Sequence, residues 1–275
     1  MSALRFLPSL LLAVFLAACG GAPSETPEAT GPSADTSATV RFWAAFRSAT
    51  AHRIAGRWEE AARDYRTAHT LRPDHEDALY YLANVEMERG RYEAAREALD
   101  RLLAINPRSV RGFIRRGDLS VCGPETPSLA PEAALADYER AHHLNGEQSG
   151  PLLRMAAAHL ILGQFDAARP LLDDVLALLH DNPEAHLLRG YVAWKTGRRD
   201  LALRHLEAAR QGAAPRTKES SRSNEGDTRS GASPLARSEA CRPFAPFVRR
   251  LTEGSPTASI YEDLDAYLGR FGRAS

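Results

Sequence analysis

The chain has 275 residues, of which 44% are hydrophobic and 25% are charged. Its 35 basic and 35 acidic residues give a formal net charge of zero at pH 7. This composition is typical of a globular protein. It argues against a strongly basic nucleic-acid-binding protein and against a wholly disordered acidic chain. The length allows one large domain or two small ones.

The first 19 residues have the parts of a secretory signal. One basic residue, Arg5, precedes an apolar run from Phe6 to Ala18, and Cys19 follows. The 13 residues of this run would span about 20 Å as a helix. A bilayer has a hydrocarbon core of roughly 30 Å, so a transmembrane helix is disfavoured here.

The sequence Leu16-Ala17-Ala18-Cys19 resembles the lipobox of bacterial lipoproteins. The resemblance implies that residues 1–18 are a signal peptide, that cleavage precedes Cys19 and that the Cys19 thiol is lipidated. It implies a location in the bacterial cell envelope. Gly20 stands where many inner-membrane lipoproteins have Asp, which favours the outer membrane, facing the periplasm or the cell surface. An ordinary cleaved signal or a buried N-terminal helix is the alternative.

The segment from Cys19 to residue 41 predicts a lipidated cysteine followed by a flexible tether. It is rich in Gly, Pro, Ser and Thr up to about Thr39 and has no aromatic residue in that stretch. Such a composition does not bury a core.

Residues 42–210 contain an internal repeat. Gly56 and Gly90 are 34 residues apart, and so are Gly163 and Gly197. Each glycine opens a similar motif, in which an acidic residue stands three positions after the glycine and an alanine five positions after it. The motif Gly90-Arg-Tyr-Glu-Ala-Ala95 is one example.

This period resembles the tetratricopeptide repeat (TPR) family. The resemblance implies an all-α fold, a right-handed superhelical solenoid of about five helix–turn–helix units over residues 42–210. A glycine ends the first helix of most units, because it adopts a left-handed conformation. No single helix pair buries its apolar face, so the units must stack. Five additional residues in the third unit predict a lengthened turn at Val121–Pro131.

The C-terminal part of the chain divides into two segments. Residues 211–243 have hardly an apolar side chain and predict a disordered linker. Residues 244–275 regain helical apolar spacing and predict a helical segment of two short amphipathic helices. Two interpretations remain open: the helices cap the solenoid, or they form a tethered segment that docks on a partner.

No catalytic, phosphate-binding or metal-binding motif stands out, which predicts a protein that is not an enzyme and needs no cofactor. With Cys19 lipidated, Cys122 and Cys241 remain. They either form a disulfide in an oxidising compartment or stay as two free thiols. The sequence does not provide the Cα distance that would decide between these states.

In the TPR family, ligands usually lie along the concave face, which the first helix of each unit lines. Aromatic residues and arginine carry much of the energy of protein interfaces, and arginine binds carboxylates through paired hydrogen bonds. The alternative for each residue is packing within the chain. The 34-residue frame places on this face Trp43, Phe46, Arg47, Thr50, Arg53, Tyr80, Tyr81, Asn84, Met87, Arg111, Arg115, Asp118, Arg154, Tyr191 and Trp194.

The resemblance does not extend to the clamp that TPR cochaperones use for C-terminal carboxylates, because only Asn84 matches that set. The architecture implies a non-enzymatic, membrane-anchored scaffold or adaptor. It would bind another protein of the cell envelope, not nucleic acid, and aid the assembly of an envelope or pilus complex. A surface lipoprotein that binds a glycan or another small ligand is the alternative, since sugars stack on aromatic rings.

Overall fold

The structure is a computed structural model that describes residues 34–122, 129–214, 241, 244–253 and 257–271. The predicted signal peptide, Cys19 and the tether up to residue 33 lie outside the described residues. So do most of the predicted linker and positions 123–128 of the predicted long turn.

The described residues form α-helices and one short 3-10 helix, and none of them is in a strand. No helix among them is both long enough and apolar enough to cross a membrane. In chain order the helices are α1 (Ala34–Ile54), α2 (Trp58–Leu71), α3 (Glu76–Glu88), α4 (Tyr92–Ile105), α5 (Val110–Asp118), η1 (Leu119–Val121), α6 (Pro131–Leu144), α7 (Ser149–Ile161), α8 (Phe165–Leu178), α9 (Pro183–Lys195), α10 (Arg199–Ala213), α11 (Ala245–Thr252) and α12 (Thr257–Phe271).

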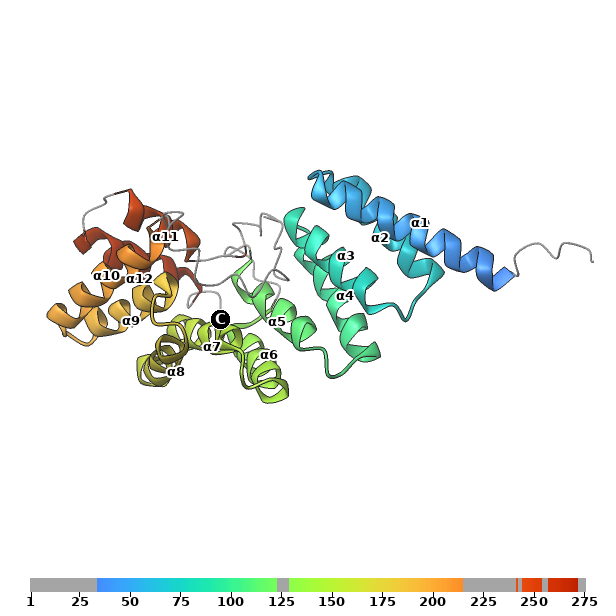
Figure 1. Ribbon diagram of the computed structural model, residues 1–275. Helices are drawn as coiled ribbons and strands as arrows, with labels where there is room; N and C mark the ends of the chain where they lie inside the picture. The colour runs from blue at the N-terminus through green and yellow to red at the C-terminus, as the bar shows by residue number, and fades with distance from the viewer. Residues whose placement is uncertain (1–33, 123–128, 215–240, 242–243, 254–256, 272–275) are drawn as a thin grey trace, which may run out of the picture.

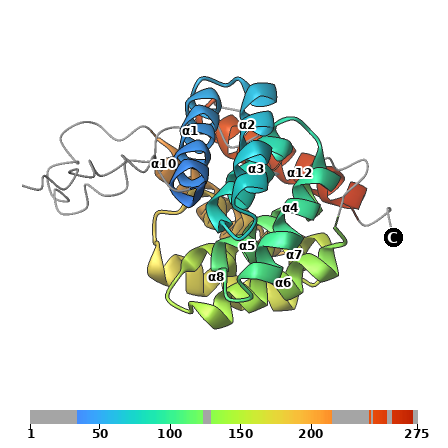
Figure 2. The ribbon, with the colours of Figure 1, turned by 90° about the vertical axis from the view of Figure 1, so that its right-hand side faces the viewer.

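The helices from α1 to α10 form five consecutive pairs, each packed against the next (Figure 1). The first helix of a pair contacts its own second helix, and that second helix contacts the first helix of the following pair. Viewed from the α1 end, α1 to α3 lie above α6 and α8, so the stack rotates as it advances (Figure 2). The all-α solenoid of five units is therefore confirmed.

The four repeated glycines end the first helices as the sequence predicts. Gly56, Gly90, Gly163 and Gly197 have φ angles between 69° and 74°. After Gly90, the Arg91 amide donates to the Glu86 carbonyl at 2.8 Å. A side chain at these positions would be strained by the left-handed backbone, although no neighbouring atom would meet it.

The first helix begins at Ala34, inside the segment predicted as a tether. Its N-terminal part is held by the second helix, because Arg72 donates to the Thr39 hydroxyl at 2.9 Å and its guanidinium lies over the Phe42 ring. The segment from Ala34 to Val40 contains neither Gly nor Pro, so it continues the helix. The expected boundary of 19–41 is thus corrected: residues 34–41 are helical. At the other end, α10 continues to Ala213, three residues into the predicted linker.

The C-terminal helices pack on the solenoid. Helix α11 contacts α9 and α10, while α12 contacts α7 and α9 (Figure 1). Ile260, Leu264 and Phe271 of α12 are buried in the same apolar cluster as the helices of the last two units. Of the two interpretations, the structure shows the one in which these helices cover the end of the solenoid.

A close approach between α9 and α12 depends on Gly190. A Cβ atom at Gly190 would lie 1.9 Å from the Tyr261 hydroxyl, and the Tyr261 side chain is buried, at 3% exposed. We expect Gly190→Ala to reduce the free energy of unfolding by about 1–3 kcal/mol through overpacking. Urea denaturation of the full chain measures this change.

Gly269→Ala is the matched control, because Gly269 lies on the exposed side of α12 and a Cβ there meets nothing within 4 Å. This variant should keep or raise the stability, by up to about 1 kcal/mol. Equal effects of the two substitutions would contradict the packing of α12 against α9.

Candidate functional site

The inner face of the solenoid, formed by α1, α3, α5, α7 and α9, has three zones. An aromatic zone lies on α1 and α3, a polar network follows on α3, α5 and α7, and the face of α7 and α9 is covered by α12. Each zone contains some of the residues that the sequence places on the concave face.

The aromatic zone is a continuous cluster with an exposed edge. Trp43 packs edge-on against Phe46 at 5.8 Å between ring centroids, and Phe46 packs against Tyr81 at 6.1 Å. The rings of Tyr80 and Tyr81 are 5.4 Å apart. Trp43 remains 41% exposed, which is unusual for a large aromatic side chain. The structure thus brings together the four predicted aromatic residues of the first two units.

Two arginines stack on this zone. The Arg53 guanidinium lies 4.6 Å from the centre of the Tyr81 ring, and that of Arg111 lies 4.6 Å from the centre of the Tyr80 ring. Arg111, on α5, also pairs with Asp77 on α3, the first helix of the preceding unit. Cation–π contacts of this kind hold the guanidinium planes against the rings while their edges can still bind another group. Arg53 thus adds positive charge to the apolar zone, whereas Asp77 balances the charge of Arg111.

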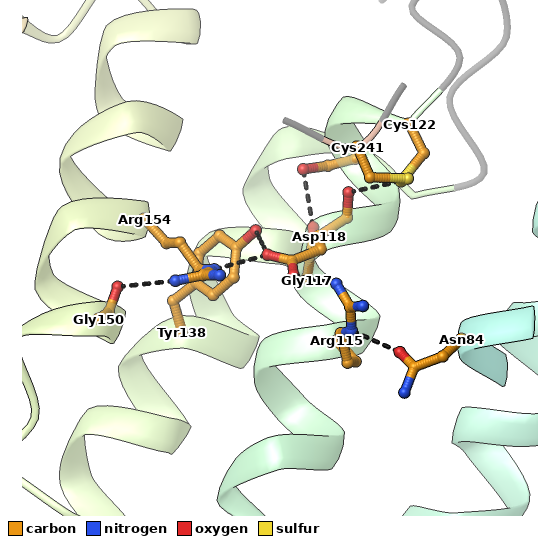
Figure 3. Close-up of polar contacts among 10 residues, drawn as sticks. Asn84, Arg115, Gly117, Asp118, Cys122, Tyr138, Gly150, Arg154 and Cys241 are labelled. Atoms are coloured by element: carbon orange, nitrogen blue, oxygen red, sulfur yellow. Dashed lines mark hydrogen bonds and ion pairs between the residues drawn. A yellow bond between two sulfur atoms is a disulfide. The ribbon is translucent and has the colours of Figure 1, made fainter. Parts of the chain in front are cut away.

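The polar network centres on Asp118 at the end of α5, which is 5% exposed (Figure 3). Its Oδ1 accepts hydrogen bonds from Arg154 Nε at 2.7 Å and from the Tyr138 hydroxyl at 3.2 Å. Its Oδ2 pairs with Arg115 Nη1 at 3.2 Å. Arg115 Nε then donates to Asn84 Oδ1 at 2.6 Å. One carboxylate thus connects three successive units.

The Asp118 carboxylate stabilises the protonated forms of its neighbours in this network. Attraction by the Asp118 carboxylate raises the pKa of Arg154. Burial raises the pKa of Tyr138 well above its usual value, and the nearby Asp118 charge raises it further. Both groups consequently stay protonated and act as donors. A buried carboxylate is stable only when it is paired and hydrogen-bonded in this way.

The third zone is filled by the chain itself. Asp265 of α12 accepts hydrogen bonds from the Tyr191 hydroxyl at 2.6 Å and from Lys195 Nζ at 2.8 Å. These two bonds hold the pKa of Asp265 below its usual value. Burial is the main cause that raises the pKa of Tyr191. Tyr191 is only 2% exposed.

An aromatic contact completes the covering of this zone. The rings of Trp194 and Tyr261 are stacked, with centroids 6.2 Å apart. The Tyr261 hydroxyl donates to the Ala202 carbonyl at 3.1 Å. Tyr191 and Trp194 therefore bind α12, which corrects the expectation that they are open to a partner. The Trp194 ring is half-buried in this contact.

A disulfide returns the C-terminal segment to the middle of the solenoid. Cys122 and Cys241 are 119 residues apart in sequence, and their Cα atoms are 4.3 Å apart. Cys122 directly follows η1, next to Asp118, so the bridge lies beside the polar network (Figure 3). Of the two states that the sequence left open, the structure has the bonded one.

One further predicted residue is not on the concave surface. Met87 is 2% exposed and packs in the apolar cluster of the first three units. It lies three residues after Asn84 on α3, but it turns into the stack because its neighbours there are apolar. Arg47, in contrast, is exposed on α1 next to Trp43.

The sequence did not single out four residues that the structure adds to these zones. His75 lies 5.8 Å from Trp43 between ring centroids, and Tyr138 binds Asp118. Tyr261 and Asp265 contact α9 across about 70 residues of sequence. The apolar stripe of α12 was visible as a pattern, but no spacing rule indicates the surface that such a stripe covers.

Comparisons with known proteins agree with this fold. The tetratricopeptide repeat family matches residues 52–112 and 130–191. A crystal structure of MamA protein has a TM-score of 0.55 at 18% identity and covers 63% of this chain and 92% of that chain. A MamA RS-1 double mutant has a TM-score of 0.57 at 14% identity, covering 62% and 94%. TTC0263, a thermophilic TPR protein of Thermus thermophilus, has a TM-score of 0.50 at 25% identity, covering 62% and 91%.

No curated protein matches the chain. The likeness to MamA, at these identities, shows the fold alone. Together with the family match it supports tetratricopeptide repeats, a scaffold fold that is typical of protein–protein interaction and generally not enzymatic.

The Asp118 network predicts that the stability of the fold depends strongly on this one carboxylate. We expect Asp118→Asn to lower the free energy of unfolding by about 3 kcal/mol, because two arginines then lose their buried counter-charge. The exposed pair between Asp166 and Arg169 serves as the control, since the Asp166 side chain is 95% exposed. Asp166→Asn should change stability by less than about 1 kcal/mol. Denaturation curves of similar midpoint for both variants would refute this role of Asp118.

The disulfide predicts a local effect of reduction. We expect hydrogen exchange in α11 and α12 to become faster when dithiothreitol reduces the bridge, since the chain entropy of the C-terminal segment rises. By the loop-entropy argument, the gain in stability from a loop of 119 residues is at most about 5 kcal/mol. Helices α1 and α2 provide the internal control and should exchange at an unchanged rate. Uniform acceleration, or none, would count against a local role for the bridge.

Proposed function

We propose that this protein is a lipid-anchored scaffold of the bacterial cell envelope, which binds another envelope protein through the aromatic zone of its concave face. The observation that carries the proposal is a difference in exposure between the two ends of the concave face. The chain covers its own α7–α9 face with α12, whereas Trp43 and its neighbours on α1 and α3 stay partly exposed.

The chemistry of the aromatic zone defines the kind of partner. Trp43, Tyr80 and Tyr81 offer apolar surface, while Arg47 and Arg53 add positive charge at its edge. Aromatic side chains and arginine are the residue types that dominate binding energy at interfaces. A partner segment that combines apolar and acidic side chains is complementary to this zone.

Two observations support the location. The segment Leu16-Ala17-Ala18-Cys19 has the lipobox pattern. The Cys122–Cys241 disulfide is of a kind that persists in oxidising compartments such as the bacterial periplasm. A lipid anchor holds the solenoid near the membrane and so raises the effective concentration of any bound envelope protein. Assembly of an envelope or pilus complex is a role that such a scaffold suits.

The test is a pull-down from detergent-solubilised envelope with the full-length lipidated chain as bait. Trp43→Ala/Tyr80→Ala removes the exposed ring and its neighbour, and we expect it to reduce recovery of one specific envelope protein at least about tenfold. The matched control is Leu178→Ala/Leu203→Ala, two exposed apolar residues on second helices. The control should retain the partner.

A third bait distinguishes anchoring to the membrane from binding of the partner protein. Cys19→Ala should move the protein from the membrane fraction to the soluble fraction while leaving partner binding in solution intact. Equal recovery with the aromatic-zone variant and the wild type would overturn the assignment of the binding surface. Retention of the Cys19 variant in the membrane fraction would overturn the lipid anchor.

A further inference from the structure

A cavity lies where the open part of the concave face meets the covered part. Its volume is about 160 Å³. Its polar wall comes from Arg115, Asp118, Arg154 and Glu184, and its back wall includes Cys241 and Phe244 of the C-terminal segment. The cavity therefore depends on the return of that segment through the disulfide.

The size of the cavity limits what it can hold. One water molecule needs roughly 10–15 Å³ by this measure, so the space exceeds the need of a single water about tenfold. Sites for drug-sized ligands are larger, roughly 300–1,000 Å³. A ligand of this cavity is therefore a small metabolite, not a peptide or an oligosaccharide.

The polar wall presents both signs of charge. Two guanidinium groups and two carboxylates line it, which gives no net charge. Among the described residues, no hydrogen bond engages Nη2 of Arg115 or of Arg154, although their other nitrogens bind Asp118, Asn84 and the Gly150 carbonyl. A carboxylate has about four acceptor sites, and three protein donors use the carboxylate of Asp118.

Several apolar side chains complete the lining beside Ser120 and Tyr138. Leu153, Ile161 and Phe244 contribute to it, and the first two lie on α7 beside Arg154. Convergent polar groups beside an apolar patch fix the orientation of a bound small molecule. Groups of opposite charge beside an apolar wall match a molecule that carries a carboxylate, an ammonium group and a hydrocarbon side chain.

We propose that this cavity binds a free α-amino acid with an aliphatic side chain. The ligand carboxylate accepts from the free guanidinium edges of Arg115 and Arg154, and its ammonium group donates to Asp118 and Glu184. The side chain lies against Leu153, Ile161 and Phe244. This site is separate from the aromatic zone on α1 and α3, so it goes beyond the scaffold role and does not depend on it.

Isothermal titration of the oxidised, detergent-solubilised full chain with L-leucine tests the proposal. We expect saturable binding at micromolar to millimolar concentrations. L-Leucinamide lacks the carboxylate and 4-methylpentanoate lacks the ammonium group, so each should bind at least about tenfold more weakly. Absence of saturable heat with leucine, or equal affinity for all three compounds, would overturn the proposal.

Two variants locate the binding within the molecule. Ala157→Leu adds bulk to the cavity wall and should abolish leucine binding. Leu153→Phe tests the same point at a half-buried position, in case the first variant fails to fold. Ala177→Leu on the exposed face of α8 is the matched control and should bind as the wild type does. Unchanged binding by a folded cavity variant would show that leucine binds elsewhere.

Discussion

The structure depends on one buried carboxylate. Asp118 lies where two large apolar clusters meet, one from the first three units and one from the last two units with the C-terminal helices. Neither cluster reaches across the middle of the solenoid by itself. Arg115, Tyr138 and Arg154 converge on Asp118 from three helices, and the disulfide at Cys122 begins four residues later. Charge pairing and a covalent bond thus join the two halves, in addition to a small apolar cluster of Ala134, Tyr138 and Ala158 between α6 and α7.

This junction also explains how a regular repeat acquires two different surfaces. The same concave face is open on α1 and α3 and closed on α7 and α9. On the closed part, aromatic rings of α9 and α12 stack. The Asp265 carboxylate of α12 also accepts hydrogen bonds from Tyr191 and Lys195 of α9. The open part offers aromatic rings with arginines in place of the lysine. The internal contact therefore supports the proposal that an acidic group beside aromatic side chains suits the open part of this face.

Most of the solenoid was predictable because its determinants are local. The repeated glycines and the 34-residue spacing act within one helix pair, and the structure follows them closely. The candidate site was predictable only in part. Arg111, Arg115 and Arg154 lie on the expected face, but Tyr191 and Trp194 are covered by a helix 70 residues away, and no local pattern encodes that contact. Met87 faces the interior because its apolar side chain packs there, although the 34-residue repeat spacing placed it on the concave face. The early start of α1 was missed because the composition before Val40 resembles that of a tether.

The disulfide gives the chain the topology of a closed ring from Cys122 to Cys241 with two free arms. One arm carries the N-terminal segment, the first two units and α5, and the other carries α11 and α12. A protease that cuts anywhere within the ring leaves both products joined through sulfur, so the N-terminal segment stays attached to every unit of the solenoid. After a single cut, the protein would run as one band on a non-reducing gel and as two fragments on a reducing gel. A single break in the backbone between units three and five therefore does not by itself separate the two parts of the molecule.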